Sequence, residues 1–199
     1  MQPHPDRGRA VSRLLVLPAA LITIVLLAYL ATRPLGNGGP QASFFVIGSA
    51  VPGIQLGQVA PGTAEAGSPE LSLTDLDGAT VDLADFEGRP IWVIFWKTAC
   101  EPCEEEAPEV AAAYAAHQAD GLVVIGIDIW ESAAVVQDYA EGHPIAYPIA
   151  IATTPAAMDA YGVWGAPTHY FIDRSGIIRG RHFGPVTRDL INENLGRII

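Results

Sequence analysis

Cysteine is scarce in this chain, with two residues, Cys100 and Cys103, among 199. So few cysteines exclude a small scaffold held together by several disulfides. A structural zinc site needs four ligands, and neither a second cysteine pair nor the spacing of the five histidines supplies them. The two cysteines are therefore expected to pair with each other, either as a static disulfide or as a redox pair.

Basic residues are few as well, with 11 Lys and Arg against 22 Asp and Glu, for a formal net charge of −11. Such an acidic chain is a poor match for nucleic acid and for flat docking on anionic lipid. We interpret the excess charge as an aid to solubility, and a basic partner protein is the bolder interpretation.

Long apolar stretches are also rare, and the one that stands out is Leu14–Ala31, 18 residues without a charge. At about 1.5 Å per residue it reaches roughly 27 Å, enough to cross the core of a bilayer. Arg7, Arg9 and Arg13 precede it and Arg33 alone follows closely. This asymmetry predicts a single membrane span, with the N-terminus in the cytoplasm and everything after Arg33 on the far side.

A cleaved signal peptide is the competing interpretation of this stretch. A small-x-small cleavage site should follow the apolar run closely. Tyr29 and Leu30 spoil that pattern at the end of the run, and Gly48-Ser49-Ala50 lies well beyond it. The sequence therefore favours an uncleaved anchor.

Composition divides the chain into four parts. Residues 1–13 are expected in the cytoplasm and residues 14–32 in the membrane. Residues 33–69 are rich in Gly, Pro, Ser and Ala, which is typical of a flexible linker. Residues 70–199 carry regular apolar patterns and are predicted to form one domain.

Strand and helix patterns alternate within that domain. The predicted elements are strands at 90–96, 122–128 and 149–151, helices at 104–118, 131–141, 154–161 and 187–195, and hairpins at 71–83 and 169–179. Thr154, followed by Pro155 at the first helical position, and Thr187 are predicted N-caps. This order predicts an α/β fold with parallel strands at the centre and antiparallel edges.

The cysteines fall at the turn between the strand at 90–96 and the helix that follows it. Unpaired N–H groups and the helix dipole favour a thiolate at such a position. Cys100, in the turn, is expected to be the more exposed and to attack, and Cys103, one turn inside the helix, to resolve the mixed disulfide. Cys-x-x-Cys beside a strand–helix unit predicts a redox pair rather than a static disulfide.

At this point the chain resembles a known family. Trp96-x-x-x-Cys100-Glu101-Pro102-Cys103, followed by Glu106-Ala107-Pro108, is similar to the thioredoxin-like proteins of the TlpA/ResA/CcmG group. The resemblance covers about residues 56 to 199. It implies a thioredoxin-like fold, with a central mixed sheet and an added N-terminal β-hairpin. It also implies a thiol–disulfide oxidoreductase that is tethered to the bacterial cytoplasmic membrane by a single pass. Its C-terminal domain is expected on the extracytoplasmic side, as in relatives that serve cytochrome c maturation.

Glu106 stands three residues after Cys103, on the same helix face. In ResA-like proteins the matching residue lies by the active site and handles protons. The resemblance therefore implies that Glu106 accepts the proton of Cys103, and a solvated surface acid is the alternative. Ile94 occupies the position where thioredoxin itself carries a buried acid.

The resemblance also implies which residues contact a client protein. Pro167 matches a cis-proline beside the cysteine pair, and the backbone of Ala166 before it offers hydrogen bonds to the client. Trp96 is expected beside the pair, and Glu101 and Pro102 between the cysteines also face the client. Ala99 stands where the family usually has Trp, which leaves the redox chemistry intact but changes the partner surface.

The predicted function is the reduction of protein disulfides. Four glutamates surround the cysteines, namely Glu101, Glu104, Glu105 and Glu106. Their negative charge disfavours a thiolate and leaves the disulfide form favoured, which points to a low potential. The family implies apocytochrome c as a client and a membrane electron donor of the CcdA/DsbD type. No cofactor is expected beyond the Cys100–Cys103 disulfide, no metal, and no nucleic-acid partner.

Three other functions of thioredoxin-like proteins fit the sequence less well. The glutamates argue against an oxidant of the DsbA type. Copper delivery by Sco-like proteins uses Cys-x-x-x-Cys and a histidine where this chain has Arg174. A peroxidase would need the pattern Pro-x-x-x-Thr-x-x-Cys, which is absent from the sequence.

Overall fold

The computed structural model describes residues 55–63, 70–143 and 145–199. The predicted membrane span at 14–32 and most of the predicted linker lie outside these ranges. Within them, no helix has both the length and the apolar character needed to cross a membrane.

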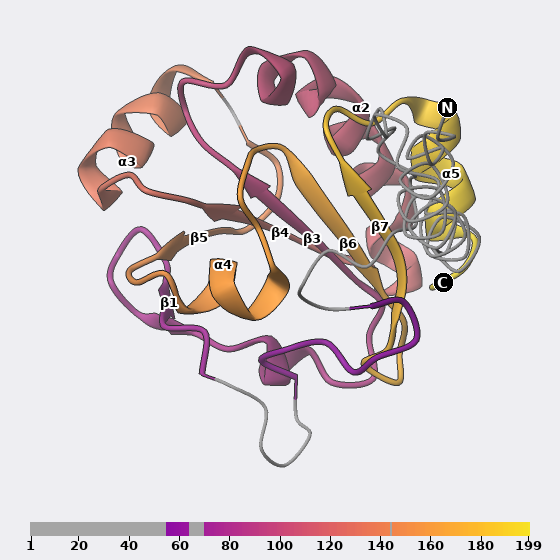
Figure 1. Cartoon of the computed structure of the whole chain (residues 1–199). Helices are drawn as coiled ribbons and strands as arrows, with labels where there is room; N and C mark the ends of the chain where they lie inside the picture. The colour runs from indigo at the N-terminus through magenta and orange to yellow at the C-terminus, as the bar shows by residue number, and fades with distance from the viewer. Residues whose placement is uncertain (1–54, 64–69, 144) are drawn as a thin grey trace, which may run out of the picture. The chain divides into compact units, whose positions relative to one another are not determined.

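A mixed sheet forms the centre of the domain (Figure 1). In the described ranges its strand order is β2-β1-β5-β4-β3-β6-β7. β4 pairs in parallel with β3 and β5, and every other pairing between neighbours is antiparallel. The strands are β1 (Leu73–Thr74), β2 (Thr80–Val81), β3 (Ile91–Trp96), β4 (Val123–Asp128), β5 (Ile149–Ala152), β6 (Thr168–Ile172) and β7 (Ile178–Phe183). The predicted α/β fold with a parallel centre and antiparallel edges is confirmed.

β3 and β4 occupy the middle of this sheet because both of their faces are apolar. Every residue of the two strands is buried, as expected for parallel strands that are covered on both sides. Their register pairs Trp96 with Asp128 at the carboxyl end. The loops that follow the two strands therefore emerge side by side.

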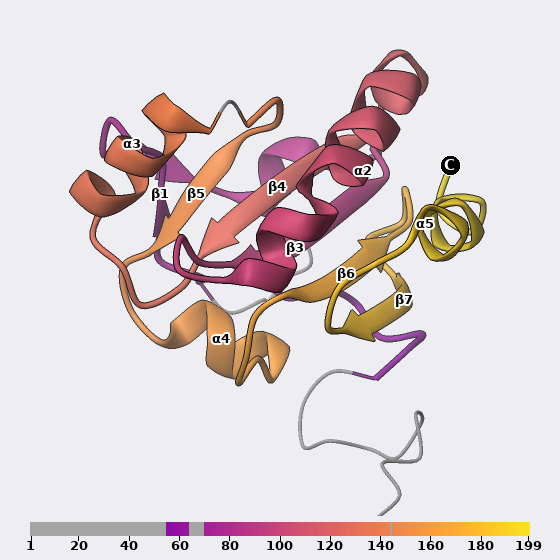
Figure 2. The same cartoon turned by 90° about the horizontal axis from the view of Figure 1, so that it is seen from above.

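Helices cover both faces of the sheet (Figure 2). α2 (Glu101–His117), α3 (Ala133–Gly142) and α5 (Arg188–Leu195) contribute Val110, Val136 and Ile191 to the core on one face. α4 (Ala156–Tyr161) and the short helix η1 (Leu83–Phe86) contribute to the core on the other face. Another short helix, η2 (Gln118–Asp120), extends the end of α2.

Helix starts agree with the prediction in part. Thr187 is the N-cap of α5, and its hydroxyl accepts a hydrogen bond from the Leu190 N–H, as predicted. α4 starts one residue later than predicted, with Pro155 as its N-cap, although the Thr154 hydroxyl still accepts from the Ala156 N–H. α2 starts three residues before the predicted 104, because Cys100 is its N-cap and Pro102 fits a first turn that needs no N–H partner.

Residues 55–63 correct the predicted domain boundary. The linker prediction covered 33–69, but Val59 forms an antiparallel bridge with Ile177 and Ala60 is fully buried. The Tyr161 hydroxyl also donates a hydrogen bond of 2.9 Å to the carbonyl of Pro61. The Gly and Pro content of this stretch therefore serves turns that pack against the domain rather than a free linker.

Candidate active site

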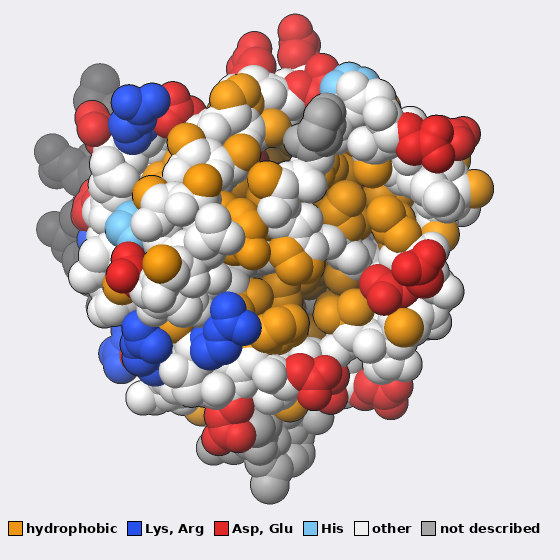
Figure 3. All heavy atoms as spheres, turned by 180° about the vertical axis from the view of Figure 1, so that it is seen from behind, with side chains coloured by type: hydrophobic (Ala, Val, Ile, Leu, Met, Phe, Trp, Pro, Cys, Tyr) orange, Lys and Arg blue, Asp and Glu red, His pale blue; other side chains and the backbone are white. Residues whose placement is uncertain are grey.

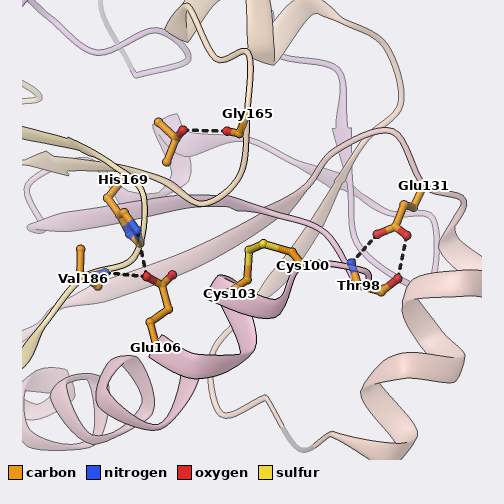
Figure 4. The surroundings of a disulfide bond; sticks show 9 residues. Thr98, Cys100, Cys103, Glu106, Glu131, Gly165, His169 and Val186 are labelled. Carbon is orange, nitrogen blue, oxygen red and sulfur yellow. Dashed lines mark hydrogen bonds and ion pairs between the residues drawn. A yellow bond between two sulfur atoms is a disulfide. The ribbon is translucent and has the colours of Figure 1, made fainter. Parts of the chain in front are cut away.

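Cys100 and Cys103 form a disulfide at the N-terminus of α2 (Figure 4). Cys100 is the N-cap in extended backbone and Cys103 lies in the first turn, with their Cα atoms 5.2 Å apart. The two residues are 6 % and 8 % exposed, so the prediction that Cys100 is the more exposed is wrong for this oxidised form. Both belong to the apolar cluster that includes Trp92, Trp96 and Val186, and this cluster packs around the bond from the sheet side.

The Ala166–Pro167 peptide bond is cis, as the family resemblance implied. Thr168 pairs with Phe95, one residue before the end of β3, so the proline lies at the same end of the sheet as the cysteines. The Thr168 hydroxyl donates to the carbonyl of Gly165 at 2.8 Å and fixes the loop. Ala166 packs against the cluster that contains both cysteines.

Glu106 is buried beside the disulfide rather than solvated, with 4 % of its surface exposed. Its Oε2 accepts a hydrogen bond of 2.8 Å from the Val186 N–H and lies 3.3 Å from the Nε2 of His169. The alternative of a surface acid is therefore wrong. Glu101 and Pro102, by contrast, are exposed, so they are free to contact another protein.

A second acidic grouping, which the sequence analysis did not single out, lies on the other side of the disulfide (Figure 4). Glu131 accepts hydrogen bonds from the Thr98 N–H at 2.5 Å and from the Thr98 hydroxyl at 2.7 Å. Burial alone would raise the pKa of Glu131, but these bonds and the neighbouring Asp128 and Lys97 together lower it. Glu131 thus fixes the loop that leads into Cys100.

Asp128 lies at the carboxyl end of β4 and is fully buried. Burial, followed by the hydrogen bond and charge of Glu131, raises the pKa of Asp128 to about 8. Asp128 therefore carries a proton at neutral pH and donates it to the Glu131 carboxylate, since two ionised carboxylates could not share this space. The only sequence signal for this group was an acid at the end of a buried strand.

Two exposed tryptophans lie on loops at this end of the sheet. Trp130, 60 % exposed, follows β4 in left-handed backbone with φ 69°, which is unusual for a bulky residue. Trp164, 61 % exposed, precedes the cis-proline, and its ring lies 5.9 Å from that of Phe183. Trp92, in contrast, is fully buried in the core.

The indole of Trp96 packs beside the cysteine pair in space that is open only because residue 126 is a glycine. A methyl group on Gly126 would lie 2.9 Å from the Trp96 Nε1 and 3.0 Å from the Tyr147 ring. Trp96 also lies against Tyr139, with ring centroids 5.6 Å apart, so its indole has little room to move.

Gly126→Ala is therefore expected to displace Trp96 and to destabilise the domain by about 1–3 kcal/mol. Urea unfolding followed by tryptophan fluorescence measures both effects. Gly142→Ala is the matched control, since nothing lies within 4 Å of a methyl group there. Equal stability of the two variants would mean that Gly126 does not hold the indole in place.

Grooves elsewhere on the domain do not include the cysteines. One of about 550 Å³ is lined by the β1–β2 turn, the end of α3 and the segment 145–149, and another of about 420 Å³ by 86–89 and 173–177. On the face seen from behind, apolar side chains gather at the centre, with acidic side chains around much of them and basic side chains at the lower left (Figure 3). The chemistry of the disulfide is thus confined to one end of the sheet.

An α/β domain with a disulfide at a helix N-terminus, beside a cis-proline, defines the class of thioredoxin-like thiol–disulfide oxidoreductases. The model of the AhpC/TSA family matches residues 65–181. The thiol-disulfide oxidoreductase ResA of Geobacillus thermodenitrificans is 31 % identical over 131 residues, which cover 66 % of this chain and 75 % of ResA. ResA of Bacillus thuringiensis is 30 % identical over 66 % of this chain and 76 % of its own. This chain belongs to the AhpC/TSA family, and it is a thiol–disulfide oxidoreductase of the ResA type.

Solved structures agree with this chain in fold. A thiol:disulfide interchange protein DsbE from Chlorobium tepidum superposes with a TM-score of 0.63 at 23 % identity, over 72 % of this chain and 97 % of DsbE. StoA from Bacillus subtilis superposes with a TM-score of 0.54 at 21 % identity, over 64 % of this chain and 98 % of StoA. These likenesses show the thioredoxin-like fold.

Proposed function

We propose that the chain is a membrane-anchored, extracytoplasmic reductase that delivers electrons to protein disulfides through Cys100-Glu101-Pro102-Cys103, in the manner of cytochrome c maturation. The observation that carries the proposal is the acidic setting of the disulfide. Glu101 and Glu104 lie in the first turn of α2, Glu106 is buried beside the bond, and Glu131 holds the preceding loop. Negative charge on all these sides opposes a thiolate, so the oxidised pair is favoured and the dithiol is a good electron donor.

The reaction starts from the reduced pair. The Cys100 thiolate attacks one sulfur of the client disulfide, a mixed disulfide forms, and the other client sulfur leaves as a thiolate that takes a proton from water. Cys103 then loses its proton, attacks the sulfur of Cys100 and displaces the second client thiolate. Two electrons have passed to the client, and the Cys100–Cys103 disulfide of the present structure is the product.

Client contacts are proposed at the same end of the sheet. The backbone before Pro167 offers the hydrogen bonds of an added strand, as in other extended-peptide sites. Trp164 and Trp130 present apolar surface on their loops, and Glu101 and Pro102 are exposed in the first turn of α2. An extended, partly apolar segment around a client cysteine fits this combination, and apocytochrome c is the proposed example.

The anchor and its orientation rest on the sequence, through the uncharged run at 14–31 and the arginines before it. In that location the pair needs a source of electrons, and a membrane donor of the CcdA/DsbD type is proposed. A tag at the C-terminus that proves accessible only from the cytoplasm would contradict the proposed topology.

The reduction potential of the pair tests the direction of electron flow. Equilibration in redox buffers, read by thiol alkylation, is expected to give about −270 mV or lower, the range of thioredoxin. A value near −120 mV would mean an oxidant of the DsbA type instead. Tight one-to-one binding in a copper titration would favour the Sco-like alternative.

A further inference from the structure

His169 is the one imidazole of the described residues that is fully buried, and it faces the Glu106 carboxylate. Its Nε2 lies 3.3 Å from Oε2 of Glu106, and the two side chains are 0 % and 3 % exposed. Apart from this contact, neither ring nitrogen has a hydrogen-bond partner among the described residues. The same Oε2 of Glu106 accepts the hydrogen bond from the Val186 N–H (Figure 4).

The ring of His169 is held in place by its neighbours. Its centroid lies 6.0 Å from that of Trp92 on β3 and 6.2 Å from that of His182, its direct partner in the β6–β7 register. Because the ring is fixed, its Nε2 stays directed at the Glu106 carboxylate. The contact is therefore a built feature of the core rather than a surface encounter.

Among the residues that the structure describes, few titratable groups surround this pair. α2 supplies Cys103 and Glu106, β7 supplies His182, and the segment before β5 supplies Tyr147. Burial and then the neighbouring His169 lower the pKa of His182, and burial and then Glu106 raise the pKa of Tyr147, so both remain neutral near pH 7. The charge state next to Cys103 is thus governed by Glu106 and His169 together.

Burying a polar ring against a carboxylate is costly unless the arrangement does something that an apolar side chain could not. A position on β6 with full burial would otherwise suit the Tyr, Phe and Ile that follow it. The ordinary pKa is near 4.3 for a glutamate, near 6.5 for an imidazole and near 8.5 for a thiol. The pKa of an imidazole is therefore about two units closer to that of a thiol than the pKa of a carboxylate is. A carboxylate backed by an imidazole is accordingly the better acceptor for a thiol proton.

We propose that His169 is a positioning residue for Glu106, and that the two act as one unit that takes up the proton of Cys103 when the mixed disulfide is resolved. This inference rests on the proposed dithiol mechanism. The S–H bond of Cys103 breaks, its proton passes to a Glu106 oxygen, and the Glu106–His169 contact holds it as a carboxylate–imidazolium pair. The thiolate of Cys103 forms the bond to Cys100 and the client sulfur leaves with its electron pair. The proton returns to water before the next cycle.

The test uses the reduced full chain and 5,5′-dithiobis(2-nitrobenzoate), which releases one coloured thiolate when Cys100 attacks and a second when Cys103 resolves the mixed disulfide. His169→Gln retains a donor toward Glu106 but cannot take up the proton. We expect its second release to slow by about 10-fold at pH 7, part of the 10²–10⁴-fold that a general base contributes. The pH of half-maximal rate should rise by about one unit or more, toward the value near 8.5 of an unassisted thiol.

Four further variants separate this role from packing. His169→Phe keeps a flat aromatic ring without the nitrogens, and it should slow the second release as His169→Gln does. In a Glu106→Gln background, adding His169→Gln should change the rate by less than about 2-fold, because a residue that acts through Glu106 has nothing left to act on. His117→Gln, at the far end of α2, is the matched control and should behave as the original chain.

The outcomes are distinguishable. Unchanged second-release kinetics and pH profile in His169→Gln, or full additivity with Glu106→Gln, would overturn the role of His169 while leaving the dithiol mechanism intact. Failure of the unsubstituted chain to release the second thiolate would instead overturn the proposed dithiol function. Thermal unfolding of each variant shows whether a slow rate reflects loss of the fold.

Discussion

Replacing Cys103 by serine will convert the protein into a trap for its client. Cys100 caps α2, where the unpaired N–H groups of the first turn support its thiolate during attack. Cys103 lies inside the first turn and reaches Cys100 with Cα atoms 5.2 Å apart, so it is placed to resolve the intermediate. Without it the mixed disulfide persists, and multiple-turnover reduction should fall by at least about 1,000-fold.

The trapped species is measured by non-reducing electrophoresis and mass spectrometry after incubation with a disulfide-containing client. A band that disappears on reduction and that joins client and Cys100 is the expected product. Cys100→Ser is the matched control and should form no such band. If Cys100→Ser traps the client and Cys103→Ser does not, the roles assigned to the two cysteines are reversed.

Replacing Asp128 by asparagine will stabilise the domain at alkaline pH and leave it unchanged in acid. The pKa of Asp128 is raised to about 8 by burial and by Glu131, whereas an unfolded aspartate titrates near 3.8. Between these two values the unfolded chain releases a proton that the folded chain retains, so this group lowers stability as the pH rises. Asparagine has the same shape, donates permanently to Glu131 and does not titrate.

The expected gain in unfolding free energy is therefore near zero at pH 4 and about 2–4 kcal/mol at pH 8, below the full linkage value because the site can relax. Urea unfolding of the oxidised protein across this pH range measures it. Asp138→Asn on the exposed side of α3 is the control and should show no such trend. A constant difference at every pH would show that Asp128 does not hold the extra proton.

Local sequence was enough to predict the centre of the site. The apolar run of β3, the cysteine spacing and the helix-forming residues after it are features of one stretch of chain, and the structure places them as expected. The family resemblance added the cis state of Pro167 and the proximity of Glu106 to the pair.

The residues that surround the cysteines could not be found in this way. Thr98 and Glu131 are 33 positions apart, and Glu106 and Val186 are 80 apart, so their contacts depend on the strand order. His169 shows no motif in the sequence, because its meaning comes from the β6 register and the facing helix. The exposure of Cys100 was misjudged since position in a turn does not account for the cluster packed against the disulfide.

The point where the described chain enters the domain has a mechanical consequence. Residue Gly57 donates its N–H to the carbonyl of Ile178, and Ile178 pairs with Ile172 opposite Ile91, at the end of the sheet remote from Cys100. A pulling force applied at Gln55 would first break the Gly57–Ile178 hydrogen bond at this edge, and the Val59–Ile177 bridge would follow. β3 and β6, which support the two cysteines, would be the last strands to carry that force. Tension on the chain would therefore leave the geometry of the disulfide site unchanged until the edge had come apart.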